Sequence, residues 1–294
     1  MLVAYKYRLY PNKEQQEYFV KCFGCVRFIY NRMLSDKTEY YKETKQKLNN
    51  TPAQYKKKFE WLKEVDSLAL ANAQINLQTA YNNFFKRPEV GFPKFKSKKN
   101  HNYSYTTNNQ GGSIYVSDRH IKLPKIGLVR VKKHRDFEGL IKSVTVSQTP
   151  SGKYFVSVLV NQNDKEKLPK SNNEIGIDLG IKEFCITSDG EMIENPKYLR
   201  KSEKKLRKLQ KDLSRCKKGS KNREKCRIEV AKQHEKITNQ RKDFLHKLSI
   251  SIVSENQTIV LEDLRVKNMM SNHKLAKSIA DVSWSEFVSL LFCS

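Results

Sequence analysis

The strongest signal for the fold lies at residues 174–180, which read EIGIDLG. Isoleucines alternate with smaller or acidic residues, and Asp178 stands just before the closing Leu-Gly. This pattern predicts a buried strand that ends at a carboxylate. Residues 258–262, TIVLE, repeat the pattern and end at Glu262. Strands of one sheet would bring both carboxylates to the same edge.

The segment between these two strands predicts a hairpin followed by long helices. Residues 183–188 and 191–193 have strand-like sequences around an Asp-Gly dipeptide, which is typical of tight hairpin turns. From 196 to 254 the spacing of apolar residues predicts one long helical region, broken near 217–222. We interpret this region as a helical hairpin. A strand, a hairpin and helices in this order fit an RNase H-like fold.

Asp178 and Glu262 are the candidate catalytic and metal-binding residues. Two carboxylates a few ångströms apart repel each other unless a cation lies between them, and Mg²⁺ prefers such oxygen ligands. Two-metal phosphoryl-transfer enzymes hold their metals in this way, usually with a third acidic ligand. The competing interpretation is that an acidic residue after a strand is a common turn or helix-capping residue.

The composition indicates a polyanionic partner. The 294 residues include 57 Lys or Arg and 31 Asp or Glu, so the formal net charge is +26. A polyanion would relieve the self-repulsion of such a charge, so nucleic acid is the expected partner, ahead of an anionic membrane surface. The length predicts two domains, or three small ones, and a hydrophobic content of 38% is enough to build packed cores.

Several other classes of protein are excluded. No apolar run approaches the roughly 20 residues of a membrane span, and the first residues lack the apolar block of a signal peptide. Six cysteines are too few for a disulfide framework, so we expect a reducing cytoplasm. Cys22 and Cys25 form a CxxC pair in a helical segment, with no second pair elsewhere. We therefore predict core packing and no zinc site.

The predicted hairpin is the most basic part of the chain. Residues 197–247 hold 20 Lys or Arg and 6 Asp or Glu, a net charge of 20 − 6 = +14. Since a solvated face usually balances its charges, we favour phosphate contact, which gives affinity rather than sequence reading. The alternative is a merely solvated surface. The predicted contacts are Lys201, Lys204, Lys205, Arg207, Lys208 and Lys211.

Residues 1–160 predict a compact β-barrel that carries a helical insertion. Residues 2–9 alternate like a strand. Residues 11–88 have helical periodicity, with Asn12 as the expected N-cap of the first helix. From 103 to 160 short alternating segments predict further strands. We expect the first strand to join them, which makes the helical unit an insertion in a β domain.

The remaining boundaries follow from composition. Residues 161–173 are polar and charged and predict a linker. Residues 174–294 then form the second domain, and residues 281–287 are expected to open its final helix. The predicted fold class is therefore α+β with more than one domain.

Two segments mix aromatic and basic residues. In nucleic-acid complexes aromatic rings stack on unpaired bases while Lys and Arg hold phosphates. In the first segment we select Tyr5, Tyr7 and Arg8, although alternating Tyr also fits an ordinary strand. Residues 91–99, GFPKFKSKK, have no strand pattern that would explain the aromatics, so we favour binding there. The candidates in this loop are Lys94, Lys96, Lys98 and Lys99.

Four motifs in order resemble the TnpB family of transposon-encoded RNA-guided DNA endonucleases, which are related to type V CRISPR effectors. They read YRLYPN at 7–12, GFPKFK at 91–96, GIDLG at 176–180 and LEDL at 261–264, and the similar order extends to DVSW at 281–284. The resemblance implies a wedge-like β-barrel with an inserted helical recognition unit, then a RuvC-like nuclease domain. It also implies a guide RNA transcribed from the element itself and a double-stranded DNA target.

The resemblance also implies roles for individual carboxylates. Asp178 matches the first RuvC carboxylate and Glu262 the second, and both would hold Mg²⁺ if the nuclease is active. Asp263 follows Glu262 directly and on a strand would face the other way. Asp281 matches the residue before the Trp helix and not a catalytic one.

The sequence departs from the family pattern near its end. In the family more chain follows the helix at 281–287, and it holds a four-Cys zinc ribbon and the third RuvC Asp. The resemblance therefore implies an incomplete RuvC-like domain, weak metal binding and little or no cleavage. A truncated gene product or transposon remnant is one explanation. A nuclease-dead relative that keeps RNA-guided DNA binding, for example as a repressor, is another, and a non-specific basic protein is the third alternative.

Overall fold

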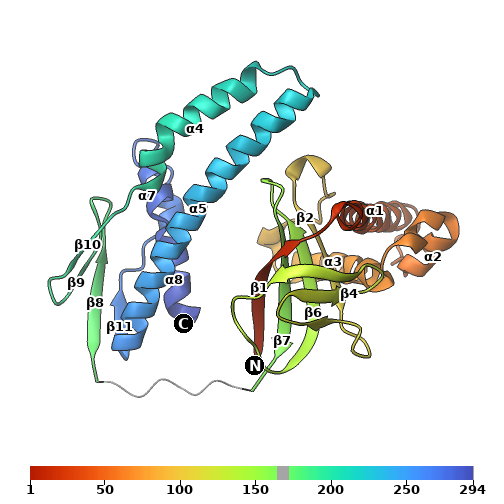
Figure 1. The fold of residues 1–294 in the computed structure, drawn as a ribbon, viewed down its shortest axis with the longest axis horizontal. Helices are drawn as coiled ribbons and strands as arrows, with labels where there is room; N and C mark the ends of the chain where they lie inside the picture. The colour runs from red at the N-terminus through yellow and green to blue at the C-terminus, as the bar shows by residue number, and fades with distance from the viewer. Residues whose placement is uncertain (164–171, 294) are drawn as a thin grey trace. The chain divides into compact units, whose positions relative to one another are not determined.

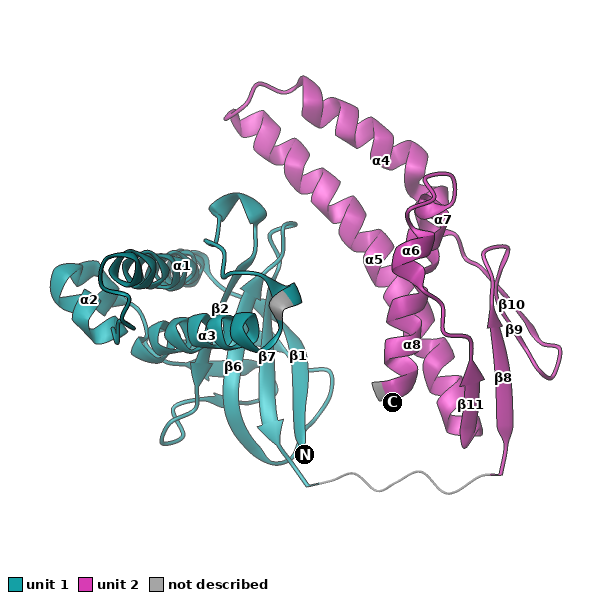
Figure 2. Ribbon diagram, turned by 180° about the vertical axis from the view of Figure 1, so that it is seen from behind, with its two compact units in different colours: residues 1–164 teal, residues 165–294 magenta. Residues whose placement is uncertain are grey.

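A computed structural model describes residues 1–163 and 172–293. The chain divides into two compact units, residues 1–164 and 165–294 (Figure 2). Each unit has a hydrophobic core of its own. Most of the predicted linker 161–173 lies outside the described residues, because residues 164–171 are not among them.

Unit 1 is built on a seven-stranded antiparallel sheet (Figure 1). The strand order is β2-β6-β7-β1-β5-β4-β3, so β1 lies between β7 and β5. The first strand of the chain therefore pairs with strands that come more than a hundred residues later. The strands are β1 (Leu2–Tyr10), β2 (Tyr103–Asn108), β3 (Tyr115–Val116), β4 (His120–Leu123), β5 (Gly127–Lys132), β6 (Leu140–Gln148) and β7 (Tyr154–Asn161).

This sheet is open, and the prediction of a closed β-barrel is wrong. β2 and β3 stand at its two edges, and β3 has only two residues. A barrel closes when its edge strands pair along their length, and a two-residue strand offers too few backbone groups for that. The predicted strands themselves are confirmed, because local alternation determines strands but carries no information on closure.

Three helices lie in the chain between β1 and β2. They are α1 (Lys13–Thr44), α2 (Pro52–Lys58) and α3 (Ser67–Lys86). The predicted N-cap of α1 is confirmed: Asn12 Oδ1 accepts a hydrogen bond from the Gln15 backbone N–H at 2.8 Å. The Gln15 side chain accepts one from the Asn12 backbone N–H at 3.1 Å, which completes a capping box.

Helix α1 packs through one apolar stripe. Phe19, Cys22, Ile29 and Met33 are fully buried at helical spacing. Cys22 and Cys25 lie on this buried side, so their predicted core packing is confirmed. Burial raises the pKa of the Cys22 thiol to about 12 and that of Cys25 to about 11. Both side chains therefore remain neutral thiols at physiological pH.

Unit 2 holds a four-stranded sheet of mixed direction. The order is β10-β9-β8-β11. β9 pairs antiparallel with both β8 and β10, whereas β11 pairs parallel with β8. A parallel pair needs a long crossover connection, and the long helices between β10 and β11 supply it. The strands are β8 (Glu174–Leu179), β9 (Glu183–Thr187), β10 (Met192–Glu194) and β11 (Thr258–Leu261).

The crossover is a helical hairpin, as predicted. It consists of α4 (Tyr198–Arg215) and α5 (Lys221–Glu255). Ser220 caps α5, because its hydroxyl accepts a hydrogen bond from the Arg223 backbone N–H at 3.1 Å. The Arg223 guanidinium in turn donates to the Leu213 carbonyl at 2.7 Å and to the Cys216 carbonyl at 3.2 Å. One arginine thus binds two carbonyls at the C-terminal end of α4.

The chain ends in three short helices, α6 (Val266–Met269), α7 (Ala276–Val282) and α8 (Trp284–Cys293). The prediction that residue 281 opens the final helix is wrong. Asp281 lies inside α7, and α8 begins at Trp284. Ser283 separates them with a left-handed backbone, φ 60°, which ends α7.

The core of unit 2 lies on one side of its sheet. Phe184 of β9 packs edge-on against Phe244 of α5 and Phe287 of α8, with ring centroids 5.1 and 5.0 Å apart. Helices α5, α7 and α8 all contribute buried residues to this core. Every helix of the described part of the chain is too short or too polar to traverse a lipid bilayer.

Candidate carboxylate site and nucleic-acid interface

The two predicted catalytic carboxylates lie on neighbouring strands. β8 and β11 are parallel and hydrogen-bonded, and Leu261 is the register partner of Ile177. Asp178 follows Ile177 within β8, and Glu262 is the first residue after β11. Since paired strands lie about 4.8 Å apart, the backbones that carry Asp178 and Glu262 run close together at the end of β11, and both residues line one hollow.

Both carboxylates belong to the open face of the sheet. In β8 the alternate residues Ile175, Ile177 and Leu179 are buried, whereas Asp178 is exposed. Glu262 is exposed in the same way after half-buried Leu261. Residues from three strands and the adjoining turns line an open hollow of 450 Å³ here: Gly176, Ile177, Asp178, Ile186, Thr187, Ser188, Val260, Leu261 and Glu262.

Local contacts fix the strand that carries Asp178. The Gly176 backbone N–H donates to Ser188 Oγ at 3.1 Å, and the Ser188 backbone N–H donates to the Gly176 carbonyl at 2.8 Å. At the other end of β8, a Cβ on Gly180 would lie 2.9 Å from the Glu183 carbonyl oxygen. The tight turn into β9 therefore requires glycine at position 180.

A buried thiol lies near Asp178 but on the core side. Burial raises the pKa of Cys185 to about 12, and the carboxylates of Glu191 and Asp178 add to the rise. Cys185 therefore keeps its proton in the metal-free protein, and it does not line the hollow. The exposed donors at the hollow are oxygens, which is the donor set that Mg²⁺ prefers over softer metals.

Two carboxylates line this hollow, those of Asp178 and Glu262. In residues 1–163 and 172–293 no group of three His, Cys, Asp or Glu residues is close enough to hold a metal ion together. Asp263 is exposed and does not line the hollow. Asp281 lies elsewhere, where its carboxylate accepts hydrogen bonds from the start of α4.

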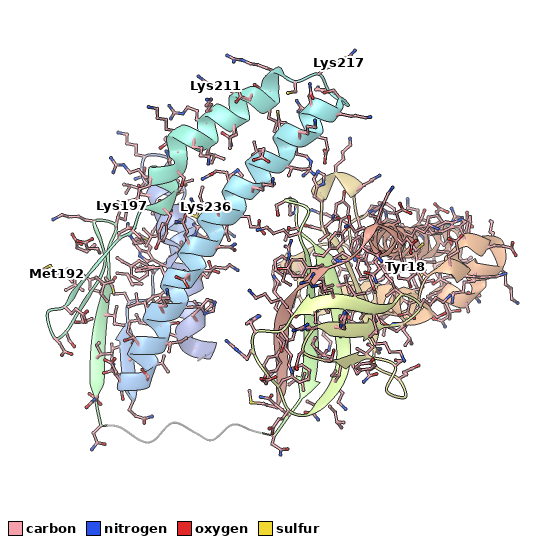
Figure 3. The ribbon with its side chains drawn as sticks, viewed as in Figure 1. Tyr18, Met192, Lys197, Lys211, Lys217 and Lys236 are labelled. Carbon is pink, nitrogen blue, oxygen red and sulfur yellow. The ribbon has the colours of Figure 1, made fainter. Side chains whose placement is uncertain are left out.

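The predicted phosphate-binding residues of the hairpin lie along α4. All six of them are exposed, and only Leu206 of this helix is fully buried. Figure 3 shows charged side chains around the hairpin, with Lys211 among those labelled. Four of the six line an open groove of 660 Å³: Lys204, Arg207, Lys208 and Lys211. The other residues that line this groove are Arg200, Glu203, Asp212 and Arg215.

Arg200 and Arg215 belong to this groove but were not predicted. They stand four residues before Lys204 and four residues after Lys211, which is the spacing of one helix face. Extending the helical period in both directions would have found them. Lys201 and Lys205 are exposed outside the groove-lining set.

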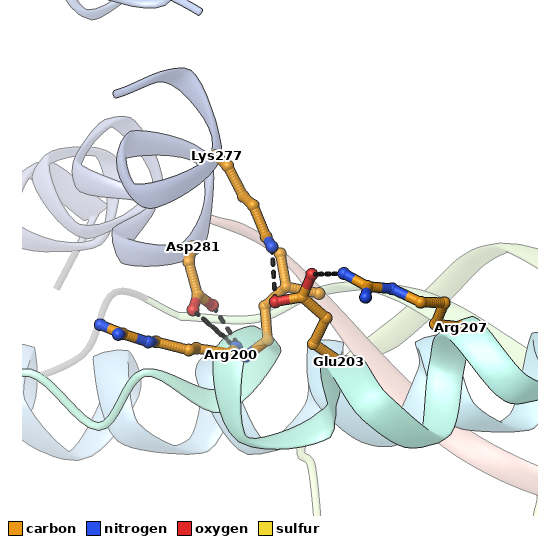
Figure 4. Close-up of polar contacts among 6 residues, drawn as sticks. Arg200, Glu203, Arg207, Lys277 and Asp281 are labelled. Atoms are coloured by element: carbon orange, nitrogen blue, oxygen red, sulfur yellow. Dashed lines mark hydrogen bonds and ion pairs between the residues drawn. The ribbon is translucent and has the colours of Figure 1, made fainter. Parts of the chain in front are cut away.

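The groove is partly neutralised at one end (Figure 4). Glu203 forms ion pairs with Arg207 at 2.8 Å and with Lys277 of α7 at 2.6 Å. Both cations lower the pKa of the Glu203 carboxyl, Lys277 most strongly. For Lys204, Lys208 and Lys211 no ion-pair partner occurs among the described residues, so these ammonium groups face solvent.

The predicted nucleic-acid contacts on β1 form hydrogen bonds or ring contacts with other residues of unit 1. Tyr5 and Tyr7 are buried, and their hydroxyls donate to the Gln162 side chain at 2.8 Å and to the Arg135 carbonyl at 2.7 Å. Burial raises the pKa of Tyr7 to about 12. The Arg8 guanidinium lies 5.1 Å from the centre of the Phe155 ring. These contacts favour the alternative interpretation, an ordinary strand, for Tyr5 and Tyr7.

All four predicted lysines of the basic loop are exposed, and one of them also makes contacts with α1. Lys96 exchanges two hydrogen bonds between its backbone and the Asn31 side chain, at 2.8 and 2.9 Å. Its ammonium lies 4.2 Å from the centre of the Tyr30 ring, and desolvation lowers its pKa. The side chains of Lys94, Lys98 and Lys99 are exposed.

An aromatic group at the end of α3 lies beside this loop and was not predicted. Phe92 packs edge-on against Phe84 and Tyr81, with ring centroids 5.5 and 5.7 Å apart. Phe85 is 75% exposed and Phe95 63% exposed. The sequence signal that could have predicted this group is the pair Phe84-Phe85, which stands next to Lys86 at the end of the helix. Exposed rings among lysines are suited to stacking on unpaired bases.

Comparisons with known proteins agree across both units. Residues 157–273 match a family model described as "Probable transposase", and residues 1–46 match one described as "Helix-turn-helix domain". The second description does not fit the geometry, because residues 1–46 hold the strand β1 and the single 32-residue helix α1.

Two curated bacterial proteins named "Putative RNA-guided DNA endonuclease" align with most of the chain. The one from Streptomyces pristinaespiralis is 38% identical over 98% of this chain and 73% of its own length. The one from Escherichia coli K12, InsQ, is 32% identical over 91% of this chain and 67% of its own length. A solved structure of Cas12f1 with sgRNA and target DNA matches 93% of this chain and 71% of that chain. Its TM-score is 0.55 at 14% identity, so it supports a likeness of fold alone.

Proposed function

Since the chain belongs to the TnpB family of transposon-encoded RNA-guided DNA endonucleases, we propose that it binds a guide RNA and uses it to find matching double-stranded DNA. The net charge of +26 suits two polyanionic partners. Sequence would be read by pairing between the guide and the DNA, while the protein contacts backbones and a short flanking motif, as in Cas-type recognition. We place the protein in the cytoplasm, and its five described cysteines are free thiols.

Within this proposal the two units have different tasks. Unit 1 would hold the guide scaffold and the target duplex, with Lys94, Lys98 and Lys99 on phosphates. The groove along α4 would hold backbone phosphates through Lys204, Lys208 and Lys211. These contacts give affinity and salt dependence and no sequence specificity.

Unit 2 would be an RNase H-like domain of the RuvC type. Three antiparallel strands followed by a fourth strand parallel to the first support this assignment. The observation that supports the site is that Asp178 and Glu262 each directly follow the register pair Ile177–Leu261 and line the same open hollow. Bound there, Mg²⁺ would supply a Lewis acid and an activated water for attack on a DNA phosphodiester.

The chain's own residues would do the positioning. Asp178 and Glu262 would hold the ion, and the Gly180 turn and the Ser188 contacts would keep β8 in place. Two carboxylates are fewer than the three that two-metal sites usually use. On these residues alone we propose weak Mg²⁺ binding and slow or no cleavage, so guided binding without cleavage, for example as a repressor, is the second candidate.

The guided part of the proposal is tested by the RNA that co-purifies with the protein. We expect one defined RNA species on sequencing. A random population of cellular RNA would overturn guided binding and leave a non-specific basic protein.

Cleavage is tested separately with guide-matched DNA and Mg²⁺. If the nuclease acts, cleavage is detected and Asp178→Ala abolishes it while DNA binding persists. If the protein only binds, the DNA is shifted without cutting and Asp178→Ala changes nothing.

A further inference from the structure

Two half-buried cysteines meet at the tip of the helical hairpin and have no role in the proposed function. Cys216 directly follows α4, Cys226 lies in the second turn of α5, and their sulfur atoms are 3.5 Å apart. The other cysteines with described side chains, Cys22, Cys25 and Cys185, are buried in the two cores. We propose that Cys216 and Cys226 are an oxidation site that forms a reversible disulfide across the hairpin tip.

The tip already holds the two sulfur atoms in place. Arg223 lies between the cysteines in the chain, and its guanidinium binds the carbonyls of Leu213 and Cys216. Ser220 caps α5 in the same loop. Cys216 Sγ also lies 3.3 Å from the Asp212 carbonyl oxygen, which limits its rotation. The sulfur atoms must therefore approach only from 3.5 Å to the roughly 2.05 Å of a disulfide.

The oxidant we name is a hydroperoxide. One thiolate attacks the peroxide oxygen, breaks the O–O bond and becomes a sulfenic acid as water leaves. The second thiol then attacks that sulfur, forms the S–S bond and releases a second water. Two thiols and one hydrogen peroxide thus give one disulfide and two waters. The hydrogen bond with Cys216 raises the pKa of Cys226, which favours Cys226 as the second, resolving thiol.

A bridge here would restrain a strongly basic part of the surface. Four lysines lie between the two cysteines, and their mutual repulsion opposes a closed tip: Lys217, Lys218, Lys221 and Lys225. A disulfide would keep the ends of α4 and α5 together against this repulsion. The tip would then present its cations in one arrangement when the protein is oxidised.

The test uses the full chain with Cys293→Ser, so that the remaining cysteines outside the hairpin tip are the three buried ones. The protein is treated with hydrogen peroxide, blocked with iodoacetamide and digested with trypsin without reductant. We expect a cross-linked peptide pair containing Cys216 and Cys226. Its mass should be lower by two hydrogen atoms than the summed masses of the two reduced peptides. Cleavage after Lys217 or Lys221 should give fragments that separate only after reduction.

Matched variants complete the test. Cys216→Ser and Cys226→Ser should each lose the cross-link, whereas Cys185→Ser should keep it. Circular dichroism of each variant separates a lost bridge from a lost fold. The proposal is overturned if both thiols alkylate fully after peroxide treatment, or if the only disulfide found joins two chains in a dimer.

Discussion

The carboxylate of Asp281 accepts hydrogen bonds from the Leu199 backbone N–H at 3.1 and 3.2 Å, although 82 residues separate the two in sequence. The first N–H groups of a helix have no partner within it. The N-cap residue of α4, Lys197, has a left-handed backbone and makes no side-chain cap. A residue from α7 therefore caps the helix that carries the basic groove, and Arg223 closes its other end.

The first prediction concerns this cap. Asp281→Ala should lower the free energy of unfolding by about 1 kcal/mol, the usual cost of losing an N-cap, measured by urea denaturation. Asp263→Ala is the control, because Asp263 is exposed and does not line the carboxylate hollow. Equal effects of the two substitutions would contradict a capping role.

The second prediction concerns the groove along α4. Replacing Lys204, Lys208 and Lys211 by Gln should make the slope of log K against log salt less negative by about 2.7. This value corresponds to three lost phosphate contacts at about 0.9 each for duplex DNA. The measurement is a binding titration at several salt concentrations. Replacing Lys13, Lys42 and Lys47, exposed lysines of α1 and the turn after it, removes the same charge outside the groove. A slope that changes as much in this control would mean that the groove lysines are merely solvated.

The third prediction concerns metal binding at Asp178 and Glu262. Mg²⁺ should raise the melting temperature of the chain, because the ion relieves repulsion between two adjacent carboxylates. Asp178→Asn should remove this rise and leave the metal-free protein at least as stable, since one of the repelling charges is gone. Asp263→Asn should keep the rise. An identical Mg²⁺ effect in all three proteins would place the ion elsewhere.

The sequence allowed prediction of what local pattern encodes. The strands next to Asp178 and Glu262, the hairpin break and the Asn12 cap all follow from spacing and residue type, and the structure has them to within a residue. Closure of the first sheet did not follow, because it depends on whether two edge strands far apart in sequence meet. The same limit applies to Asp281, whose role depends on a contact 82 residues away.

In the candidate site too, some features follow from local sequence and others depend on contacts between residues that are remote in sequence. The exposed lysines of α4 were predicted from charge density, which is a property of the chain. Tyr7 and Lys96 have the residue types of nucleic-acid contacts, yet one is buried and the other lies over the Tyr30 ring. Such contacts depend on partners such as Asn31 that are remote in sequence, so residue type alone could not separate Tyr7 and Lys96 from the lysines without these contacts.

The last prediction concerns the turn that positions Asp178. Gly180→Ala would place a Cβ 2.9 Å from the Glu183 carbonyl oxygen, a backbone atom that has little room to move. The expected loss is about 1–3 kcal/mol, the range for overpacking a tight site. Gly24→Ala is the matched control: it lies within α1 with nothing within 4 Å of its Cβ, so it should stabilise the protein by about 0.5–1 kcal/mol. Chemical denaturation measures both, and because the β8–β9 turn would shift, Gly180→Ala should also weaken the Mg²⁺ response. A Gly180→Ala protein as stable as the parent would show that the turn relaxes without cost and does not hold the carboxylate.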